Sequence, residues 1–361
     1  MEKRKFKPTK IVKIGNLKIG SKYPIRIKGM IKGDLEDVEE VIKEARILEE
    51  EGAEAIRVAI EKEKDLKIKK NLEKVLNVPL VADVHFHYKL ALKSIEEGFV
   101  AIRLNPLNIY KKNEVREIAK EAKKARISIR VGVNSGGFRE DFSSPKILAE
   151  KMVKVAREYI KVLEKENFFD IIVSLKAQNV EATILANRIF SKRFDYPLQL
   201  GITATGPFLE GVTKSALGIG MLLFEGIGNC IRISLTEESF WEIRVAKYIL
   251  QALNLRKFGP EIISCPACSR CKVNLKKIVE DFKKKLREEK VEKPVRIAIM
   301  GCIVNGPGEA YQADLGVAFG RNKGVIFKKD EILGYCKAQK LIENLMMWIN
   351  GSRKKIKEKI R

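Results

Sequence analysis

The sequence predicts an α/β protein, with a (β/α)₈ TIM-type barrel over residues 1–255 followed by a smaller α+β domain over residues 256–361. Two observations carry this prediction. In the first part, eight short β-type runs alternate with amphipathic helical stretches. After residue 255 the alternation stops, and cysteine-bearing loops interrupt the strand and helix candidates. A doubly wound open sheet is the alternative for the first part, although no Gly-rich dinucleotide fingerprint follows an early strand.

The predicted strands are short apolar runs, and the predicted helices lie between them. The strands are expected at 24–27, 55–59, 80–84, 101–104, 128–133, 171–175, 198–203 and 230–235. The helices are expected at 35–51, 113–125, 145–165, 182–192, 214–225 and 239–252. In the second domain we expect a helix at 275–289, a strand at 295–300, a hairpin of 315–319 with 324–327, and a closing helix at 331–349 that carries Cys336.

Polar side chains recur at the ends of the predicted strands, where the active sites of such barrels form. They are Arg57, Asp83, His85, Arg103, Asn105, Arg130, Asn134, Ser174, Lys176, Thr203, Arg232 and Ser234. Arginines from four strands would place several positive charges at one mouth, and a guanidinium group can bind phosphate through paired hydrogen bonds. The sequence therefore predicts a phosphorylated small molecule, with a diphosphate favoured. Pairing of these arginines with Asp and Glu in the barrel wall is the alternative.

His85 and His87 are the only histidines of the chain, and both follow the third predicted strand. His85 is the better active-site candidate because it lies beside Asp83, whereas His87 is expected to begin the next helix. Further on, Lys214 begins the predicted helix 214–225. Glu225 ends that helix, in a turn where a carboxylate is compatible with a structural role.

Four of the six cysteines occur in two segments of the second domain. Cys265, Cys268 and Cys271 are spaced three residues apart, and Cys302 follows an apolar strand in a Gly- and Pro-rich loop. Converging thiolates suit an iron–sulfur cluster or zinc, and backbone amides in a Gly-rich loop can donate hydrogen bonds to sulfur. A cluster is favoured because the cysteines do not form two CxxC pairs. From spacing alone, all four thiolates are possible ligands.

The formal net charge of +24 raises the possibility of nucleic-acid binding, and a zinc-stabilised nucleic-acid binder is the non-enzymatic alternative. However, most Lys and Arg residues lie in amphipathic helices that also contain Glu. The one dense basic block is 352–361, which we expect to be solvated and dispensable. There is no apolar run of ~18 residues and no signal-peptide pattern. We therefore expect a cytoplasmic protein without membrane or nucleic-acid partners, whose cysteines stay reduced.

Ordered motifs run along almost the whole chain. They include Val81-Ala-Asp-Val-His-Phe, Ile129-Arg-Val-Gly-Val-Asn-Ser-Gly, Cys265-Pro-Ala-Cys and Met300-Gly-Cys-Ile-Val-Asn-Gly-Pro-Gly-Glu-Ala, with further matches at 102–106, 200–203, 214–218 and 225–235. Together they resemble the 4-hydroxy-3-methylbut-2-enyl diphosphate synthase family, the iron–sulfur enzymes of the non-mevalonate isoprenoid pathway. The Asn-Gly-Pro-Gly-Glu run is the most specific of these motifs.

The resemblance implies a [4Fe–4S] cluster held by Cys265, Cys268, Cys302 and Glu309, with Cys271 as a bystander. It implies reductive ring opening and dehydration of 2-C-methyl-D-erythritol 2,4-cyclodiphosphate, with electrons from ferredoxin or flavodoxin and a homodimeric enzyme. The residues expected to bind substrate are Arg57, Asp83, His85, Arg103, Arg130, Asn134, Lys214 and Arg232. The catalytic candidates are His85, Glu309 as an exchangeable ligand, and Glu225 or a bound water as proton donor.

Two positions depart from the family pattern after the seventh strand. Gln199 stands where the family usually has His, and Ala204 stands where it usually has Glu. Either the usual residues are dispensable, or this chain is a divergent member with an altered rate or substrate. A radical S-adenosylmethionine protein, which also joins a barrel to a cluster, is a further alternative, but its usual CxxxCxxC motif is absent.

Overall fold

The computed structural model describes residues 5–320, 323–329 and 331–351. The chain divides into two compact units, 1–256 and 257–361, and each is described by itself. The basic block 352–361 and the hairpin-turn residues Arg321 and Asn322 lie outside the described residues. None of the helices in the described part of the chain is long and apolar enough to span a membrane.

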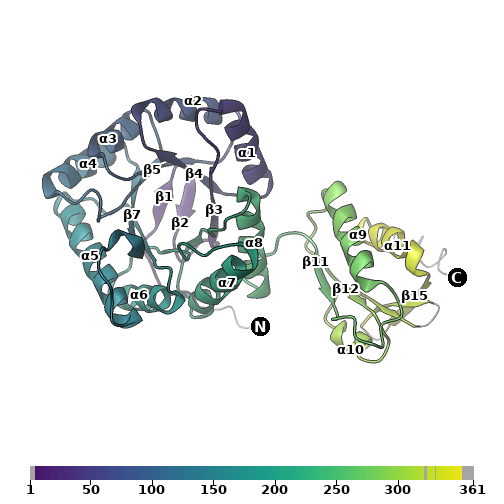
Figure 1. Cartoon of the computed structure of the whole chain (residues 1–361). Coiled ribbons are helices and arrows are strands. Elements are labelled where there is room, and N and C mark those ends of the chain that lie inside the picture. The colour runs from purple at the N-terminus through teal and green to yellow at the C-terminus, as the bar shows by residue number, and fades with distance from the viewer. Residues whose placement is uncertain (1–4, 321–322, 330, 352–361) are drawn as a thin grey trace. The chain divides into compact units, whose positions relative to one another are not determined.

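The first unit is a barrel of eight parallel strands surrounded by helices, which confirms the predicted (β/α)₈ class (Figure 1). In sheet order the strands are β8 (Ile171–Lys176), β7 (Ser128–Asn134), β6 (Ala101–Leu104), β5 (Leu80–Val84), β4 (Ala55–Ile60), β3 (Arg26–Met30), β10 (Cys230–Ile231) and β9 (Gln199–Leu200). The ring closes between β8 and β9, where Val173 pairs with Leu198 and the Val173 amide donates to the Pro197 carbonyl at 2.9 Å. An open sheet is therefore excluded.

The helices that cover the barrel each bury apolar side chains against it. They are α1 (Val38–Glu50), α2 (Ile68–Glu73), α3 (Tyr88–Glu96), α4 (Lys112–Lys124), α5 (Pro145–Lys165), α6 (Val180–Arg193), α7 (Phe208–Phe224) and α8 (Ser239–Ala252). Helix α5 shows why these boundaries form. The Ser144 side chain caps the Ile147 amide at 3.3 Å, and Pro145 occupies the first turn, where its missing N–H costs nothing. The buried residues of α5 recur at helical spacing, as Ala149, Met152 and Val153 show.

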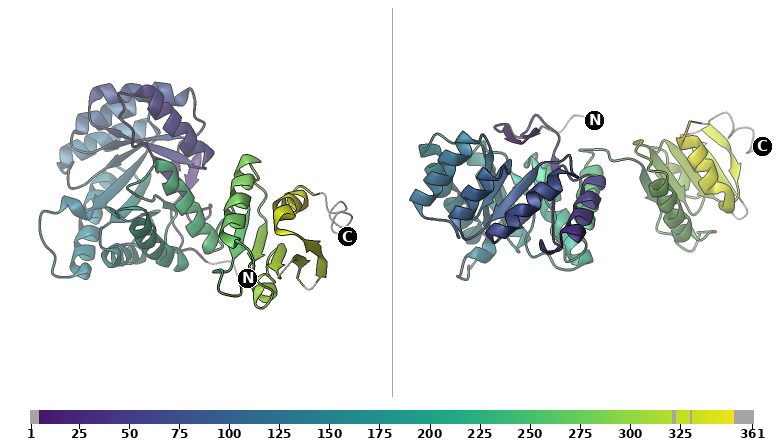
Figure 2. Two further views of the ribbon diagram at one scale, coloured as in Figure 1. Left: turned by 45° about the vertical axis from the view of Figure 1, so that its right-hand side comes forward. Right: turned by 90° about the horizontal axis from the view of Figure 1, so that it is seen from above.

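A hairpin near the N-terminus closes one end of the barrel. Strands β1 (Val12–Ile14) and β2 (Leu17–Ile19) pair antiparallel and lie across the end at which the barrel strands begin (Figure 2). Their side chains form one apolar cluster with the first inward-facing residues of the strands, including Ala55, Val81 and Cys230. The barrel is therefore plugged at its amino end. The sequence interpretation did not include this hairpin.

The second unit is a five-stranded mixed sheet with helices packed against it (Figure 1). Its strands are β11 (Glu261–Ser264), β12 (Arg296–Met300), β13 (Leu315–Phe319), β14 (Gly324–Lys328) and β15 (Glu331–Cys336), of which β11 to β13 are parallel and β13 to β15 antiparallel. The helices are α9 (Leu275–Glu288), the short α10 (Gly306–Glu309) and α11 (Leu341–Ile349). The core contains Phe282 from α9, Ile299 from β12 and Leu345 from α11.

Three local predictions are wrong. The predicted closing helix 331–349 is instead strand β15 followed by α11, because 331–336 pairs with β14 and Gly334, at φ +153°, adopts a conformation incompatible with a helix. Cys336 is thus a buried residue of a strand. The predicted strands 198–203 and 230–235 are only two residues long, since their later residues leave the ladder and enter loops. Helix α7 begins at Phe208, right after Pro207, rather than at Lys214.

Candidate active site in the barrel and candidate thiol site in the second unit

A row of charged residues crosses the barrel interior. Asp83, Arg103 and Arg130 lie on neighbouring strands β5, β6 and β7 and are paired in register. Register partners on parallel strands project to the same face, so these three side chains face the interior together. All three are almost completely buried.

Asp83 is the carboxylate at the centre of this row. Its oxygens lie 3.2 Å from Nη1 of Arg103 and 3.4 Å from Nη1 of Arg57, and the side chain of His85 is within 3.6 Å. Burial alone would raise the pKa of Asp83, but Arg57, His85 and Arg103 hold that pKa well below its usual range. Asp83 is therefore ionised at neutral pH and partly neutralises the cations around it.

The interior nevertheless carries more positive than negative charge. Six cationic side chains face it, namely Lys28, Arg57, Arg103, Arg130, Lys176 and Arg232. Apart from Asp83, the carboxylate nearest to them is Glu242, which lies 3.6 Å from Arg232 and 2.9 Å from Lys32. Burial and mutual repulsion lower the pKa of Lys28 to about 8 and that of Arg232 to about 10, and they place the pKa of Lys176 well below its usual value.

Arg130 shows this excess of positive charge most clearly. Its side chain is 4% exposed, and within the described protein neither Nε nor Nη2 has a hydrogen-bond partner. Burial and then the neighbouring Arg57 and Arg103 lower the pKa of Arg130 well below its usual range. A buried guanidinium with free donors is costly unless an anion meets it, so this geometry favours anion binding.

Two glycines provide the space for these cations. A Cβ at Gly132 would lie 2.7 Å from Nε of Arg103, whose Nη2 donates to the Gly132 carbonyl at 3.0 Å. A Cβ at Gly201 would clash with Nζ of Lys176 and lie 2.5 Å from the Arg232 carbonyl. Both positions therefore require glycine for steric reasons, although neither has a positive φ.

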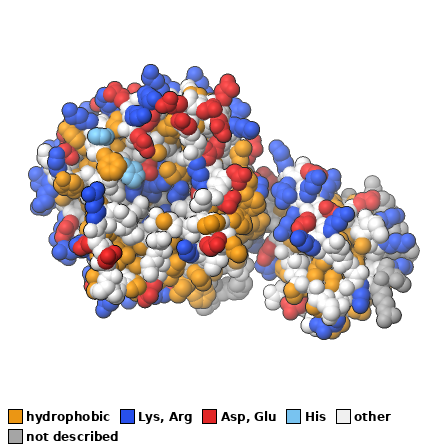
Figure 3. Space-filling view, in the orientation of Figure 1, with side chains coloured by type: hydrophobic (Ala, Val, Ile, Leu, Met, Phe, Trp, Pro, Cys, Tyr) orange, Lys and Arg blue, Asp and Glu red, His pale blue; other side chains and the backbone are white. Residues whose placement is uncertain are grey.

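The other predicted barrel residues lie towards the carboxyl ends of the strands. The Nε2 atom of His85 is 2.6 Å from Nη1 of Arg103, and the His85 side chain is 40% exposed. Asn134 is the last residue of β7, and Lys214 on α7 donates to the Thr205 carbonyl at 3.1 Å. Figure 3 shows Lys and Arg side chains in a hollow of this end of the barrel, beside the histidine side chains. His87 directly precedes α3, which begins at Tyr88, and its side chain makes no capping hydrogen bond.

Glu225 does not belong to this group. It is the residue at which α7 ends, in the turn that leads into the start of β10, and so it lies at the end of the barrel opposite the mouth. Its carboxylate forms an ion pair with Arg188 on α6. This placement removes the reason for assigning Glu225 a role in proton transfer.

The sequence interpretation missed Lys28 and gave Lys176 no role. The predicted first strand ended at residue 27, whereas β3 runs from Arg26 to Met30 and turns Lys28 into the interior. The two departures from the family pattern are separated. Gln199 is buried in the interior next to Cys230, with 4.0 Å between Oε1 and Sγ, whereas Ala204 is exposed in a loop with φ +50°.

In the second unit, the cysteines lie where neighbouring parallel strands end. Cys265 follows β11 and Cys302 comes two residues after β12, and the Gly301 amide donates to Sγ of Cys265 at 3.3 Å. The amides of Val304 and Asn305 hydrogen-bond to Cys302 and lower the pKa of its thiol. These loops thus contain donors that stabilise thiolates.

Cys271 behaves differently from the other thiols of this loop. Its Sγ donates to the Val273 carbonyl at 3.2 Å, whereas Cys265, which packs against the same core, accepts from the Gly301 amide. A Cβ at Gly301 would overlap this sulfur, so glycine is needed there. Cys268, in contrast, is exposed, and its carbonyl accepts from the Cys271 amide at 2.8 Å.

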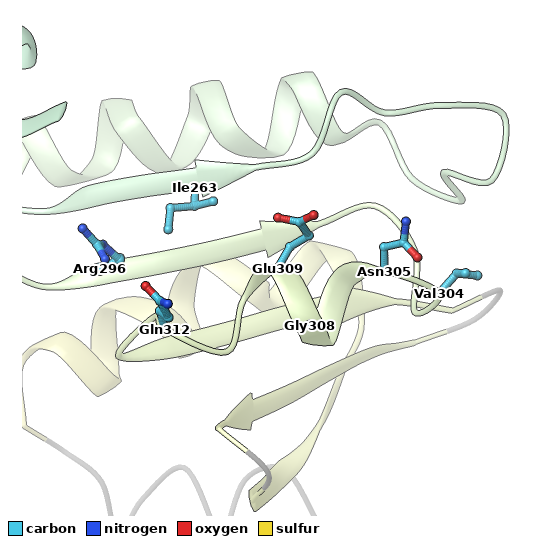
Figure 4. Close-up of a pocket in the computed structure, with 7 residues that line it drawn as sticks. All are labelled: Ile263, Arg296, Val304, Asn305, Gly308, Glu309 and Gln312. Atoms are coloured by element: carbon cyan, nitrogen blue, oxygen red, sulfur yellow. The ribbon is translucent and has the colours of Figure 1, made fainter. Parts of the chain in front are cut away.

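Glu309 ends the short helix α10 beside the carboxyl end of β12. Its side chain lines a pocket together with Asn305 from the Cys302 loop (Figure 4). The volume of this pocket is about 650 Å³. Among the described residues, no three His, Cys, Asp or Glu side chains already converge in a metal-binding arrangement. Three thiols and one carboxylate, with amides directed at two of the sulfurs, are nonetheless a donor set that fits an iron–sulfur cluster.

These features define the class of the protein: a (β/α)₈ barrel with a buried cationic interior open at one end, joined to a unit whose strand ends carry thiols. The comparison with known families agrees. Residues 9–247 match the GcpE TIM-barrel domain and residues 261–351 match the GcpE protein C-terminal domain. The chain belongs to the GcpE family.

Curated relatives match the chain over nearly its whole length. The 4-hydroxy-3-methylbut-2-en-1-yl diphosphate synthase (flavodoxin) of Caldanaerobacter subterraneus is 45% identical over 94% of this chain and 96% of its own length. The protein of the same name from Thermodesulfovibrio yellowstonii is 44% identical over 95% and 98%. Among solved structures, a dihydropteroate synthase from Xanthomonas albilineans covers 68% of this chain and 98% of its own, at a TM-score of 0.52 and 12% identity. This last likeness concerns the barrel fold alone.

Proposed function

We propose that this protein is an iron–sulfur oxidoreductase that opens and dehydrates 2-C-methyl-D-erythritol 2,4-cyclodiphosphate to 4-hydroxy-3-methylbut-2-enyl diphosphate. The observation that carries the proposal is the buried Arg130, whose Nε and Nη2 have no hydrogen-bond partner among the described residues, within a surplus of interior cations. Relatives of that name, 45% and 44% identical over almost the whole chain, support the choice of substrate. The reaction consumes two electrons and two protons and releases one water.

In this proposal the barrel binds the diphosphate. Arg57, Arg103, Arg130 and Arg232 meet its oxygens inside the barrel, with Lys214 and Asn134 nearer the mouth. Asp83 and His85 are expected to contact the hydroxylated carbon chain, because Asp83 would repel a phosphate. The burial of the four arginines favours a small anion over a nucleic-acid strand, whose backbone cannot enter a barrel interior.

The second unit is proposed to hold a [4Fe–4S] cluster through Cys265, Cys268, Cys302 and Glu309. Such a cluster supplies electrons one at a time. The amides of Gly301, Val304 and Asn305 stabilise the thiolates of Cys265 and Cys302. Glu309 would be a harder and weaker ligand for iron than a thiolate, so it would be the most readily exchanged of the four.

His85 is proposed to position the departing hydroxyl, and a bound water is proposed to deliver the proton. Nε2 of His85 accepts a hydrogen bond from Nη1 of Arg103 at 2.6 Å, so the N–H of the ring is on Nδ1 and can donate a hydrogen bond to that hydroxyl. The carboxylate of Asp83, 3.6 Å from the same ring, helps to hold its orientation. Glu225 takes no part because it lies at the other end of the barrel.

The proposed partners follow from the same chemistry. A flavodoxin or ferredoxin would deliver the electrons, as the names of the relatives indicate for flavodoxin. Exposed apolar side chains along α7, such as Leu209 and Leu217, support a homodimer in which a second copy covers them. A cytoplasmic location agrees with a cluster held by reduced thiols.

The test is turnover under anaerobic conditions. The full chain is reconstituted with iron and sulfide, reduced chemically, and given the cyclodiphosphate, and the products are identified by mass spectrometry. We expect a brown protein absorbing near ~400 nm and formation of the allylic diphosphate. A protein that carries a full cluster but neither binds nor converts the cyclodiphosphate would contradict the proposal and favour the divergent paralogue that Gln199 and Ala204 leave open.

A further inference from the structure

Glu242, in the first turn of α8, is a buried carboxylate to which the proposed reaction gives no role. Its side chain is 1% exposed, and its Oε1 accepts a hydrogen bond from the Leu235 amide at 2.9 Å. The same oxygen lies 2.9 Å from Nζ of Lys32, which also donates to the carbonyls of Leu235 at 2.8 Å and Glu237 at 2.6 Å. This carboxylate is therefore fixed between the loop that follows β3 and the loop that follows β10.

The second oxygen of Glu242 faces Arg232. Oε2 lies 3.6 Å from Nη2 of Arg232, which is close enough for an ion pair but too far for a hydrogen bond. Among the described residues, neither Oε2 of Glu242 nor Nε of Arg232 has a hydrogen-bond partner. The carboxylate thus attracts the guanidinium group and leaves Nε of Arg232 available for a ligand.

Few other contacts hold the Arg232 side chain in place. Nη1 donates to Oγ of Ser234, and Nη2 contacts Sδ of Met30, a weak acceptor, at 3.2 Å. Burial and the nearby Arg57 lower the pKa of Arg232 to about 10, and the charge of Glu242 is the strongest influence that raises it. Without Glu242, repulsion from the other cations of the interior would displace the guanidinium group.

We propose that Glu242 is a positioning residue, which holds the guanidinium group of Arg232 where it meets the diphosphate. The inference rests on the proposed function, because it requires Arg232 to bind that group. Lys32 and the Leu235 amide hold Oε1 so that Oε2 faces the arginine. The alternative role is a simple counter-charge, and it acts in the opposite direction, because a carboxylate near the site repels a diphosphate.

Two substitutions separate these roles. Glu242→Gln keeps the shape of the side chain and removes its charge, whereas Glu242→Asp keeps the charge and shortens the reach by one methylene group. If Glu242 positions Arg232, both variants should bind the diphosphate about tenfold more weakly. A counter-charge predicts tighter binding in Glu242→Gln and unchanged binding in Glu242→Asp, and that result would overturn the proposal. If Glu242→Gln does not fold, unchanged affinity in Glu242→Asp alone would overturn it.

Affinity is measured by titration calorimetry on the full chain with its cluster reconstituted, first with the cyclodiphosphate and then with inorganic pyrophosphate. In turnover, KM should rise about tenfold and kcat should change less than about twofold, because Arg232 holds the diphosphate in substrate and transition state alike. The control is Glu51→Gln. Glu51 pairs with Arg244, also on α8, but between the outer helices α1 and α8, so this variant should bind both anions like the unaltered protein.

A double-substitution cycle tests whether Glu242 acts through Arg232. Arg232→Met alone should weaken binding of both anions, and adding Glu242→Gln should weaken it no further. A further loss of the same size would show a merely structural role and overturn the proposal.

The fate of the proposed function is read separately. If pyrophosphate binds with the expected losses in the variants, while the cyclodiphosphate neither binds nor reacts, the positioning role stands and the proposed substrate is wrong. If the unaltered protein binds neither anion, both proposals fail.

Discussion

Oδ1 of Asp83 lies 3.2 Å from Nη1 of Arg103, and both side chains are 3% exposed. The same carboxylate lies 3.4 Å from Arg57. Breaking a buried ion pair by removing one partner leaves an uncompensated charge, which typically costs about 3–5 kcal/mol. Asp83 is thus the one acidic side chain of its row, and the positions of two arginines depend on it.

Replacing Asp83 by Asn should therefore destabilise the barrel by about 3–5 kcal/mol at neutral pH, measured by urea unfolding. Because the folded-state pKa of Asp83 is lowered, its contribution to stability is present above the ordinary Asp pKa of ~4 and is lost as the pH falls towards the folded-state value. The difference between the two proteins should shrink only in strong acid. Asp170→Asn, at an exposed position, should change stability by no more than ~0.5 kcal/mol. Equal effects of the two substitutions would mean that the Asp83 pairs contribute nothing.

Arg130→Met should weaken binding of the cyclodiphosphate about a hundredfold or more, because a buried charge-assisted contact is lost. Titration calorimetry measures the affinity, and iron analysis should show an unchanged cluster content, since the thiols lie on the other unit. The Tm of the free protein should not fall, because the change removes a buried cation that has two donors without a partner in the described part of the chain. Arg157→Met, on the exposed side of α5, is the matched control. Loss of iron with normal affinity would show that the substrate site is misplaced.

Gly201→Ala should destabilise the barrel by about 1–3 kcal/mol and lower substrate affinity, since the added methyl group would force Lys176 and the Arg232 carbonyl to move. Gly220→Ala, in α7, meets no atom within 4 Å and should be neutral or stabilise by up to ~1 kcal/mol. Both changes add the same methyl group, so the comparison isolates the contact with Lys176. Similar stability and affinity in the two variants would contradict the packing argument.

Cys271→Ser and Glu309→Gln separate the two possible ligand sets. The thiol of Cys271 is bonded to the Val273 carbonyl and packed against the core, so its serine variant should keep its iron and most of its turnover. Glu309→Gln should lose turnover and part of its iron, because a neutral amide is a poor ligand for iron. Iron content, absorbance near ~400 nm and turnover are measured together. The assignment is wrong if Cys271→Ser loses the cluster while Glu309→Gln keeps both cluster and full activity.

The barrel class was predictable because hydrophobic period and strand spacing repeat along the chain. Predicted and observed bounds agree for β5, β6, α5 and α8. The sequence grouped Arg103 and Arg130 because it expected both at strand ends around the mouth, whereas the structure places them inside the barrel, paired in register and buried. The local hydrophobic pattern was sufficient to predict an element wherever one of its faces is apolar.

The errors occurred where tertiary contacts override local pattern. Residues 331–336 were read as helix, but the edge of the sheet supplies a partner strand that the sequence does not reveal. Lys28 was missed because we took a charged residue to mark the end of the apolar strand. In this barrel the interior is polar, so the strand continues through Lys28 and buries it. The candidate ligands of a cluster lie in loops of irregular backbone, which have no hydrophobic periodicity. The sequence pattern therefore does not show which thiols converge or whether Glu309 joins them.

The hairpin of β1 and β2 closes the amino end of the barrel, so the interior is reached from the carboxyl end of the strands. Whatever enters must leave by the same route, so product and the water formed with it have to clear the mouth before the next molecule can reach the arginines. A product molecule that leaves slowly therefore prevents the next substrate molecule from entering. A protein of this shape should be inhibited by its product in strict competition with its substrate.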